Sequence, residues 1–265
     1  MHKLGINLES IDGLSPKEYL KTIKELGFDA TFTDMTYTTD LCHIAELCAL
    51  YDLEYSFVHA PFAGTNSLWR DGIEGEELFG SLLYCIDCCK EANIPTAVVH
   101  ISAGFNPPPM SELGQNRFRK LVEHGLNKNV NIAFENLRVP EFLAWAMDTF
   151  KQNKNVGFCW DIGHENCFTE GIEYMSLYGD RLLCTHIHDN NCKRGGDLHL
   201  LPFDGKIDYE KSMPHIKKSG YKGSLMLEVF TENKYTGNVL YRNLTPHEFL
   251  EKAYQSIKKV ASFIK

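Results

Sequence analysis

Short apolar segments alternate with amphipathic segments from one end of the chain to the other. The apolar segments are rich in β-branched and aromatic residues and are bounded by turn residues, which predicts buried strands. The predicted strands are residues 4–8, 28–33, 55–59, 95–101, 131–135, 156–161, 182–186 and 225–230. The segments between them predict helices at residues 16–26, 39–51, 74–92, 112–127, 140–150, 172–178, 209–219 and 245–263.

This alternation determines the expected fold class. Strands and helices that follow one another at roughly thirty-residue spacing imply parallel βαβ units. Eight such units in 265 residues fit an α/β fold, the closed (β/α)8 TIM barrel, better than an open sheet. No linker, low-complexity tract or change in composition interrupts the pattern, so we expect a single TIM-barrel domain over residues 1–265.

Composition narrows the class of protein. With 43% apolar and 23% charged residues, the chain has the balance of an ordinary globular protein. The net charge of −8 argues against broad affinity for nucleic acid, which needs a basic surface. The first residues contain no apolar signal segment, and no apolar run approaches the ~18 residues of a membrane span. We therefore expect a cytoplasmic protein without a membrane partner.

The nine cysteines support the same compartment. An odd number of cysteines in a long chain without a signal segment predicts free thiols in a reducing environment. Cys85, Cys88 and Cys89 lie in a predicted helix, without a second CxxC or the strand-then-helix context of a redox motif. We interpret them as packing residues.

A histidine, glutamate or aspartate, each a possible metal ligand, ends six successive predicted strands. These residues are His59, His100, Glu135, Asp161, His186 and Glu228. In a barrel the carboxyl ends of the strands converge at one rim, where active sites lie. One such residue is usually a solvated rim residue, but six in succession indicate a shared site. Converging carboxylates repel each other unless cations neutralise them, so we predict a site for divalent metal.

The stretch after the seventh strand adds further candidates. His186, His188 and Asp189 are followed by Asp197 and His199. Three histidines and two aspartates within fourteen residues are more polar side chains than a core can bury without partners. His186 and His188 share a face of the strand. Imidazole and carboxylate ligands suit Zn²⁺ or Mn²⁺, and because no cysteine occupies these positions a structural zinc site is disfavoured.

Taken together, these motifs resemble the xylose isomerase-like TIM-barrel superfamily, which includes sugar phosphate isomerases and epimerases and endonuclease IV. In the sugar 3-epimerase branch, the resemblance implies a metal held by Glu135, Asp161, His186 and Glu228, with Glu135 and Glu228 as the catalytic acid/base pair. It also implies that His164, three residues after Asp161, contacts substrate oxygens. The segment 200–208, Leu-Leu-Pro-Phe-Asp-Gly-Lys-Ile-Asp, is similar to one common in the isomerase-like branch.

Endonuclease IV resembles the chain in a larger ligand set. Its three-zinc site implies nine ligands here: His59, His100, Glu135, Asp161, His164, His186, Asp197, His199 and Glu228. Three segments depart from that enzyme: His186-Ile187-His188-Asp189-Asn190 replaces His-Leu-Asn-Asp-Ser, Asp161-Ile162-Gly163-His164 replaces Asp-Thr-Cys-His, and residues 60–64 lack its aromatic-and-Asn motif. The loops are also poor in the basic residues that a DNA-bending nuclease needs.

We therefore expect a metal-dependent isomerase or epimerase of a small sugar, sugar phosphate or polyol, which works through a metal-stabilised ene-diolate. The alternatives are an endonuclease IV-like zinc phosphodiesterase acting on abasic DNA and a non-catalytic metal-binding protein. The expected substrate contacts are His164, His188, Trp160, Phe62 and Lys193. The substrate, its phosphorylation and the number of ions, from one to three, stay open, and the sequence is compatible with a homo-oligomer.

Overall fold

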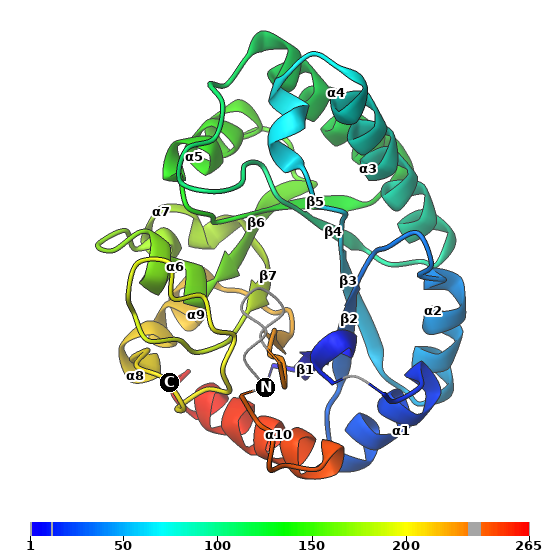
Figure 1. Cartoon of the computed structure of the whole chain (residues 1–265), viewed down its shortest axis with the longest axis vertical. Helices are drawn as coiled ribbons and strands as arrows, with labels where there is room; N and C mark the ends of the chain where they lie inside the picture. The colour runs from blue at the N-terminus through cyan, green and yellow to red at the C-terminus, as the bar shows by residue number, and fades with distance from the viewer. Residues whose placement is uncertain (1, 12, 233–239, 265) are drawn as a thin grey trace.

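The computed structural model describes residues 2–11, 13–232 and 240–264 and forms the predicted parallel barrel (Figure 1). The strands are β1 Leu4–Asn7, β2 Ala30–Asp34, β3 Glu54–His59, β4 Thr96–Val99, β5 Asn131–Glu135, β6 Val156–Asp161, β7 Leu182–His186 and β8 Leu225–Leu227. They pair in parallel in the order β7-β6-β5-β4-β3-β2-β1-β8. The expected (β/α)8 TIM-barrel fold is thus confirmed.

The barrel closes between β7 and β8 through a short contact at the rim. Ile187 N–H donates to Met226 O at 2.8 Å, and Glu228 N–H donates to Ile187 O at 3.1 Å. The hydroxyl of Thr185 accepts a further hydrogen bond from Met226 N–H at 3.1 Å. This closure brings Glu228, from the last strand, next to His186 at the end of β7.

The helices surround the strands (Figure 1). They are α1 Pro16–Leu26, α2 Leu41–Leu50, α3 Ile73–Glu91, α4 Glu112–Lys128, α5 Pro140–Thr149, α6 Ile162–Phe168, α7 Tyr174–Tyr178, α8 Tyr209–Ser212, α9 Pro214–Ser219 and α10 Pro246–Ser262. Three 3-10 helices add to them: η1 Leu8–Ser10, η2 Thr65–Trp69 and η3 Gly179–Arg181. None of the described helices combines the length and the apolarity that a bilayer-spanning helix requires.

Local sequence signals explain the ends of the long helices. Ser15 and Glu18 form a reciprocal capping box at the start of α1, and Thr245 and Glu248 form one at the start of α10. Gly27 ends α1 with φ of 104°, a conformation that glycine adopts without strain. These boundaries agree with the prediction.

The prediction was wrong in two connections. The helix expected over 209–219 is broken into α8 and α9, because Pro214 has no N–H to continue the helical hydrogen bonds. Helix α6 was not expected at all. It begins directly after β6 because Asp161 caps it, accepting a hydrogen bond from His164 N–H at 2.6 Å.

The inside of the barrel beneath the rim is filled with apolar side chains. They are Ala30, Phe32, Phe57, Val98, Ala133, Cys159, Cys184 and Met226. A separate and larger core packs between the strands and the outer helices. The imidazole of His186 stacks on Phe32, with ring centroids 5.2 Å apart. The layer of predicted ligands therefore lies directly above these apolar side chains.

Cys85 and Cys89 contribute to packing, as predicted. All nine cysteines are free thiols, and Cys85 and Cys89 are buried on the inner face of α3. Among the described residues, no cluster with metal-ligand geometry contains a cysteine.

Candidate metal centre

The structure brings all nine predicted metal ligands together at the carboxyl end of the barrel. Their donor atoms form three groups, and within each group the atoms lie within 4.8 Å of one another. The central group is Glu135, Asp161, His186 and Glu228; the second is His59, His100 and Glu135; the third is His164, His188, Asp197 and His199. Glu135 belongs to the first two groups, and His164 Nδ1, 3.1 Å from Glu135 Oε1, connects the third group to them, so the three form one continuous cluster.

The central group comes from four strand ends and is buried. His186 Nδ1 lies 3.3 Å from Glu135 Oε1 and 3.4 Å from Glu228 Oε2. It lies 3.8 Å from Asp161 Oδ2. The most exposed of the four side chains belongs to Glu228, a residue that is 9% exposed. Three carboxylates and one imidazole around a common point form a donor set that suits first-row divalent ions.

The second group uses the other oxygen of Glu135. His100 Nε2 lies 2.8 Å from Glu135 Oε2, and His59 Nε2 lies 3.3 Å from the same atom. Oε1 of Glu135 faces His186 and also His164, whose Nδ1 is 3.1 Å away. Both oxygens of this carboxylate therefore face imidazoles, and Glu135 would be a ligand residue in both groups.

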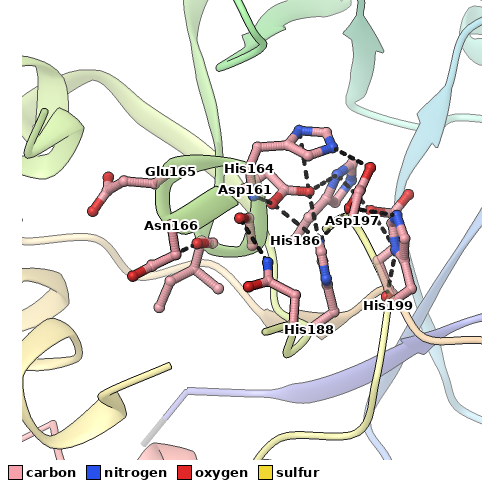
Figure 2. Close-up of polar contacts among 12 residues, drawn as sticks. Asp161, His164, Glu165, Asn166, His186, His188, Asp197 and His199 are labelled. Atoms are coloured by element: carbon pink, nitrogen blue, oxygen red, sulfur yellow. Dashed lines mark hydrogen bonds and ion pairs between the residues drawn. The ribbon is translucent and has the colours of Figure 1, made fainter. Parts of the chain in front are cut away.

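The third group surrounds Asp197, in the loop after β7 (Figure 2). His164 Nε2 lies 3.3 Å from Asp197 Oδ2, and His199 Nε2 lies 3.2 Å from Asp197 Oδ1. His188 joins this group although we predicted it as a substrate contact. Its ring stacks on His199 at 4.0 Å, and its Nε2 is 3.1 Å from Asp161 Oδ1. His188 is fully buried and contacts ligand residues instead of the cavity.

Two residues outside the ligand groups determine how Asp161 and His188 are placed. Asn136 Oδ1 accepts from Asp161 N–H at 2.8 Å, and Asn136 Nδ2 donates to Asp161 O at 2.8 Å, which joins the ends of β5 and β6. Gly163 lies against the His188 ring, and a Cβ at this position would overlap that ring. Position 163 is one of those at which the chain differs from the endonuclease IV pattern. The glycine there leaves the space that His188 needs to approach Asp161.

Backbone carbonyls orient several of the imidazoles. The Nδ1 atoms of His59 and His199 each lie 3.0 Å from a carbonyl oxygen, of Ala60 and Glu228 respectively. When the ring is neutral, as a metal ligand must be, an N–H that donates to a carbonyl leaves the other nitrogen as the free donor atom directed into the cluster. Metal-binding histidines are commonly oriented in this way.

The charges of the cluster are strongly coupled. Burial by itself would raise the pKa of Glu135, but the imidazoles of His100 and His186 outweigh it and hold this pKa well below its ordinary value. Burial would lower the pKa of His186, but Glu228 and Glu135 raise it to about 10. In the same way, Asp197 opposes the effect of burial and raises the pKa of His199 to about 9. Glu135 thus remains ionised, and the carboxylates beside His186 and His199 hold protons on these two imidazoles.

These properties fit divalent cations. Protons on His186 and His199 neutralise the carboxylates, and a metal ion can replace them. Two buried nitrogen atoms, His186 Nε2 and His188 Nδ1, also have no hydrogen-bond partner within the described ranges. Buried polar atoms are seldom left without a partner unless a ligand or ion supplies one.

Comparison with known proteins identifies the family. The family model described as xylose isomerase-like TIM barrel matches residues 20–260. The chain belongs to this family. An uncharacterised protein of Sinorhizobium fredii (strain NBRC 101917 / NGR234), y4fM, is 33% identical over 130 residues, which are 44% of this chain and 41% of that protein. The chain thus spans less than half of this curated relative.

Solved structures share the xylose isomerase-like fold over the whole chain. A xylose isomerase-like TIM barrel/4-hydroxyphenylpyruvate dioxygenase fusion protein aligns with TM-score 0.78 and 16% identity, over 99% of this chain and 43% of that one. D-psicose 3-epimerase from Clostridium cellulolyticum H10, solved with D-tagatose, aligns with TM-score 0.77 and 13% identity over 99% of both chains.

A cavity of about 190 Å³ opens beside the cluster of this xylose isomerase-like barrel. It is lined by Asp34, His59, Phe62, His100, Ser102, Ala103, Glu135, Arg138, His164, Asp197, His199, Glu228 and Phe230. The predicted substrate contacts Phe62 and His164 are thus at the cavity. Phe62 packs edge-on against His59, with ring centroids 4.9 Å apart, and forms an apolar wall.

Two predicted substrate contacts lie elsewhere. Trp160 points toward the outer helices, because it alternates with the inward-facing Asp161, and its Nε1–H donates to Glu165 Oε2 at 2.9 Å. Lys193 is exposed in the loop after β7 and does not line the cavity. Proximity in sequence to a ligand does not place a side chain in the site when strand alternation or loop geometry directs it away.

Three polar cavity residues were missed from the sequence. Asp34 ends β2, so the rule that selected the other strand ends would have found it had that strand been extended by one residue. Ser102 and Arg138 follow β4 and β5 by a few residues, in loops whose course the strand pattern does not determine. Each of the three lines the cavity with the predicted ligands.

Asp189 has a structural role, contrary to the expectation that it belongs to the metal site. Its buried carboxylate accepts hydrogen bonds from the backbone N–H groups of Asn190 at 2.8 Å, Phe203 at 2.9 Å and Ile207 at 3.0 Å. It therefore folds the loop that carries Asp197 and His199.

Asp189→Ala is expected to lower the free energy of unfolding by about 3–5 kcal/mol, because three backbone N–H groups, two of them in buried hydrogen bonds, lose a charged acceptor. Urea denaturation measures this change. The control is Asp208→Ala, which removes the exposed N-cap of α8 and should cost about 1 kcal/mol. Equal losses in the two variants would show that Asp189 does not hold the loop.

Proposed function

We propose that this xylose isomerase-like protein is a divalent-metal-dependent isomerase or epimerase of a small sugar, sugar phosphate or polyol. The observation that carries the proposal is the position of two glutamates. Glu135 and Glu228 lie 3.3 and 3.4 Å from the same nitrogen of His186, and both line the cavity. Two carboxylates beside one cavity are placed to remove and return a proton on a bound substrate.

The donor set supports a metal held by defined residues. Glu135, Asp161, His186 and Glu228 would hold a central Zn²⁺ or Mn²⁺, and the other two groups offer places for further ions. When bound, such an ion polarises adjacent carbonyl and hydroxyl oxygens of the substrate, acidifies the C–H between them and favours an ene-diolate.

The roles of the chain's own residues follow from their environment. Since the low pKa of Glu135 keeps it ionised, its carboxylate is in the form of a base. Glu228 is the more exposed of the pair and also lines the cavity. One glutamate removes the proton and the other returns it, or one returns it to the neighbouring carbon. His164 orients a hydroxyl group, and Phe62 excludes water from one wall.

Fold comparison supports a carbohydrate substrate, since D-psicose 3-epimerase shares the complete barrel. The cavity beside the ligand groups, about 190 Å³, has room for a small molecule.

Solvent exchange tests the proposal. Purified protein of measured metal content is incubated in D₂O with ketoses and aldoses and with their phosphates, and ¹H NMR follows the carbon next to the carbonyl. We expect deuterium incorporation into at least one substrate and its loss in Glu228→Gln. Metal-loaded protein that exchanges no proton across such a panel would contradict the assignment.

A specific observation favours phosphodiester hydrolysis as the second candidate. The three contiguous ligand groups, with Glu135 shared between two of them, provide for three ions, and several ions together can activate water and stabilise a phosphoryl group. Incision of an abasic-site duplex at catalytic protein concentration, with three zinc ions per chain, would support this candidate and contradict the first.

A further inference from the structure

We propose that the cavity beside the metal centre binds an oxyanion of the substrate, a phosphate or a carboxylate, between Arg138 and Ser102. The inference rests on the proposed function, because it assigns an acidic carbohydrate to the same cavity. Neither residue belongs to the ligand groups, and neither is used in the proton transfer.

Arg138 presents a guanidinium with unused donors. It lines the cavity, follows β5 by three residues and donates no hydrogen bond to any described residue. Its nearest ionic contact, Nη2 to Asp197 Oδ2, spans 3.9 Å, which is too long for a hydrogen bond. The guanidinium lies over Phe168 at 3.9 Å and near Phe105 at 5.9 Å. The aromatic rings thus fix its plane while its N–H groups stay available.

Ser102 supplies a second, independent observation. The residue is fully buried and lines the cavity, and its Oγ has no hydrogen-bond partner among the residues that the structure describes. Its loop is held in place because Asn66 Oδ1 accepts from Ala103 N–H at 2.9 Å and Asn66 Nδ2 donates to Ala103 O at 2.8 Å. A buried hydroxyl without a partner is destabilising, so a ligand that accepts its hydrogen bond would explain its presence.

The charge of the loaded site favours an anion. Four carboxylates belong to the ligand groups, from Glu135, Asp161, Asp197 and Glu228, and two divalent ions would neutralise them. Arg138, the one lysine or arginine among the described residues that line the cavity, would then be balanced only by Asp34, the one cavity carboxylate outside the ligand groups. A third ion, for which the ligand groups also offer a place, would leave the cavity positive. Arg194, over Phe105 at 4.5 Å, adds to the positive potential at this edge.

The shape of the arginine group points to the same ligand. A planar guanidinium donates two parallel hydrogen bonds to a phosphate or carboxylate, whereas a neutral sugar hydroxyl uses one donor and leaves the charge unpaired. An acidic substituent therefore uses both Arg138 and the Ser102 hydroxyl.

The test measures binding without turnover. Isothermal titration of the metal-loaded, full-length protein compares D-ribose 5-phosphate, D-ribonate and D-ribose, which separate phosphate from carboxylate and from a neutral sugar. We expect at least one of the two anions to bind about 10-fold or more tightly than D-ribose. Arg138→Met should remove this preference, and Arg138→Lys should restore only part of it, because lysine keeps the charge but loses the planar fork.

Ser102→Ala distinguishes a ligand contact from a structural role. It should weaken anion binding about 10-fold while leaving the melting temperature unchanged or higher, because it deletes an unpartnered buried hydroxyl. Arg119→Met, on the exposed face of α4, changes the net charge equally and should leave binding unaltered.

Two outcomes would overturn the inference. One is anion binding no tighter than that of D-ribose; the other is an unchanged anion preference in Arg138→Met. Because the readout is affinity, a protein that binds the anion but fails the deuterium-exchange test would contradict the proposed isomerase chemistry and leave the oxyanion site standing.

Discussion

Glu135→Gln is expected to lower the turnover number by about 10²–10⁴-fold or more, the largest effect of any single substitution in this protein. The change removes a proton-transfer group, and it also removes the one carboxylate whose two oxygens face different ligand groups, His186 and His164 on one side and His59 and His100 on the other. Deuterium exchange measures turnover, and elemental analysis of the same samples measures the metal content.

Glu228→Gln separates the two roles. Glu228 belongs to one ligand group only, so this variant should lose turnover while it keeps more of its metal than Glu135→Gln does. Glu141→Gln, an exposed substitution in the first turn of α5, is the matched control and should behave like the unmodified protein. Full activity of Glu135→Gln would end the isomerase assignment, since the proposal requires Glu135 and Glu228 to act as a pair.

Removal of bound metal with a chelator is expected to lower the melting temperature by about 8–16 °C. A ligand present at 1,000 times its dissociation constant stabilises a protein by about 4 kcal/mol, and for a chain of this size each kcal/mol corresponds to roughly 2–4 °C. The donors lie on most of the barrel strands, so an ion would connect elements that are far apart in sequence. Differential scanning calorimetry before and after chelation measures the shift.

Rebinding of the ion should release protons. His186 and His199 hold protons in the metal-free protein because facing carboxylates raise their pKa values to about 10 and about 9. A metal ligand must be deprotonated, so affinity should rise with pH through this range and fall as the pH is lowered. Asp161→Asn is the control variant, and its melting temperature should respond little to metal. A chelator that removes measured metal without changing the melting temperature of the unmodified protein would contradict a stabilising centre.

Much of the site could be predicted because strand ends are local features. In a parallel strand, the last residue before the chain turns out of the sheet lies at the carboxyl rim whatever the rest of the fold does. Polar residues such as His59, Asp161 and His186 therefore predict a site at the rim, because each is recognised as the last residue of its own strand. The order of strands and helices likewise follows from apolar periodicity, which is a property of neighbouring residues.

The errors share one physical cause. Asp189 looks like a ligand in sequence, because aspartate in a His-rich stretch has the same chemistry whether it faces a metal or three backbone amides. His188 and Trp160 were expected to contact substrate, but one is buried among the ligand residues and the other faces the helices. These choices depend on side-chain direction, and residues distant in the chain determine it.

The primary sequence thus established the barrel, the rim and the kinds of donor atom at it, since each depends on alternation and composition within a few residues. Contacts between distant segments decided the rest: that Glu135 presents both its oxygens to different histidines, that Gly163 makes room for His188, and that Arg138 and Ser102 meet one cavity with unused hydrogen-bonding groups. These segments come within hydrogen-bonding distance only in the closed barrel, because its curvature places residues that are tens of positions apart in the chain next to one another.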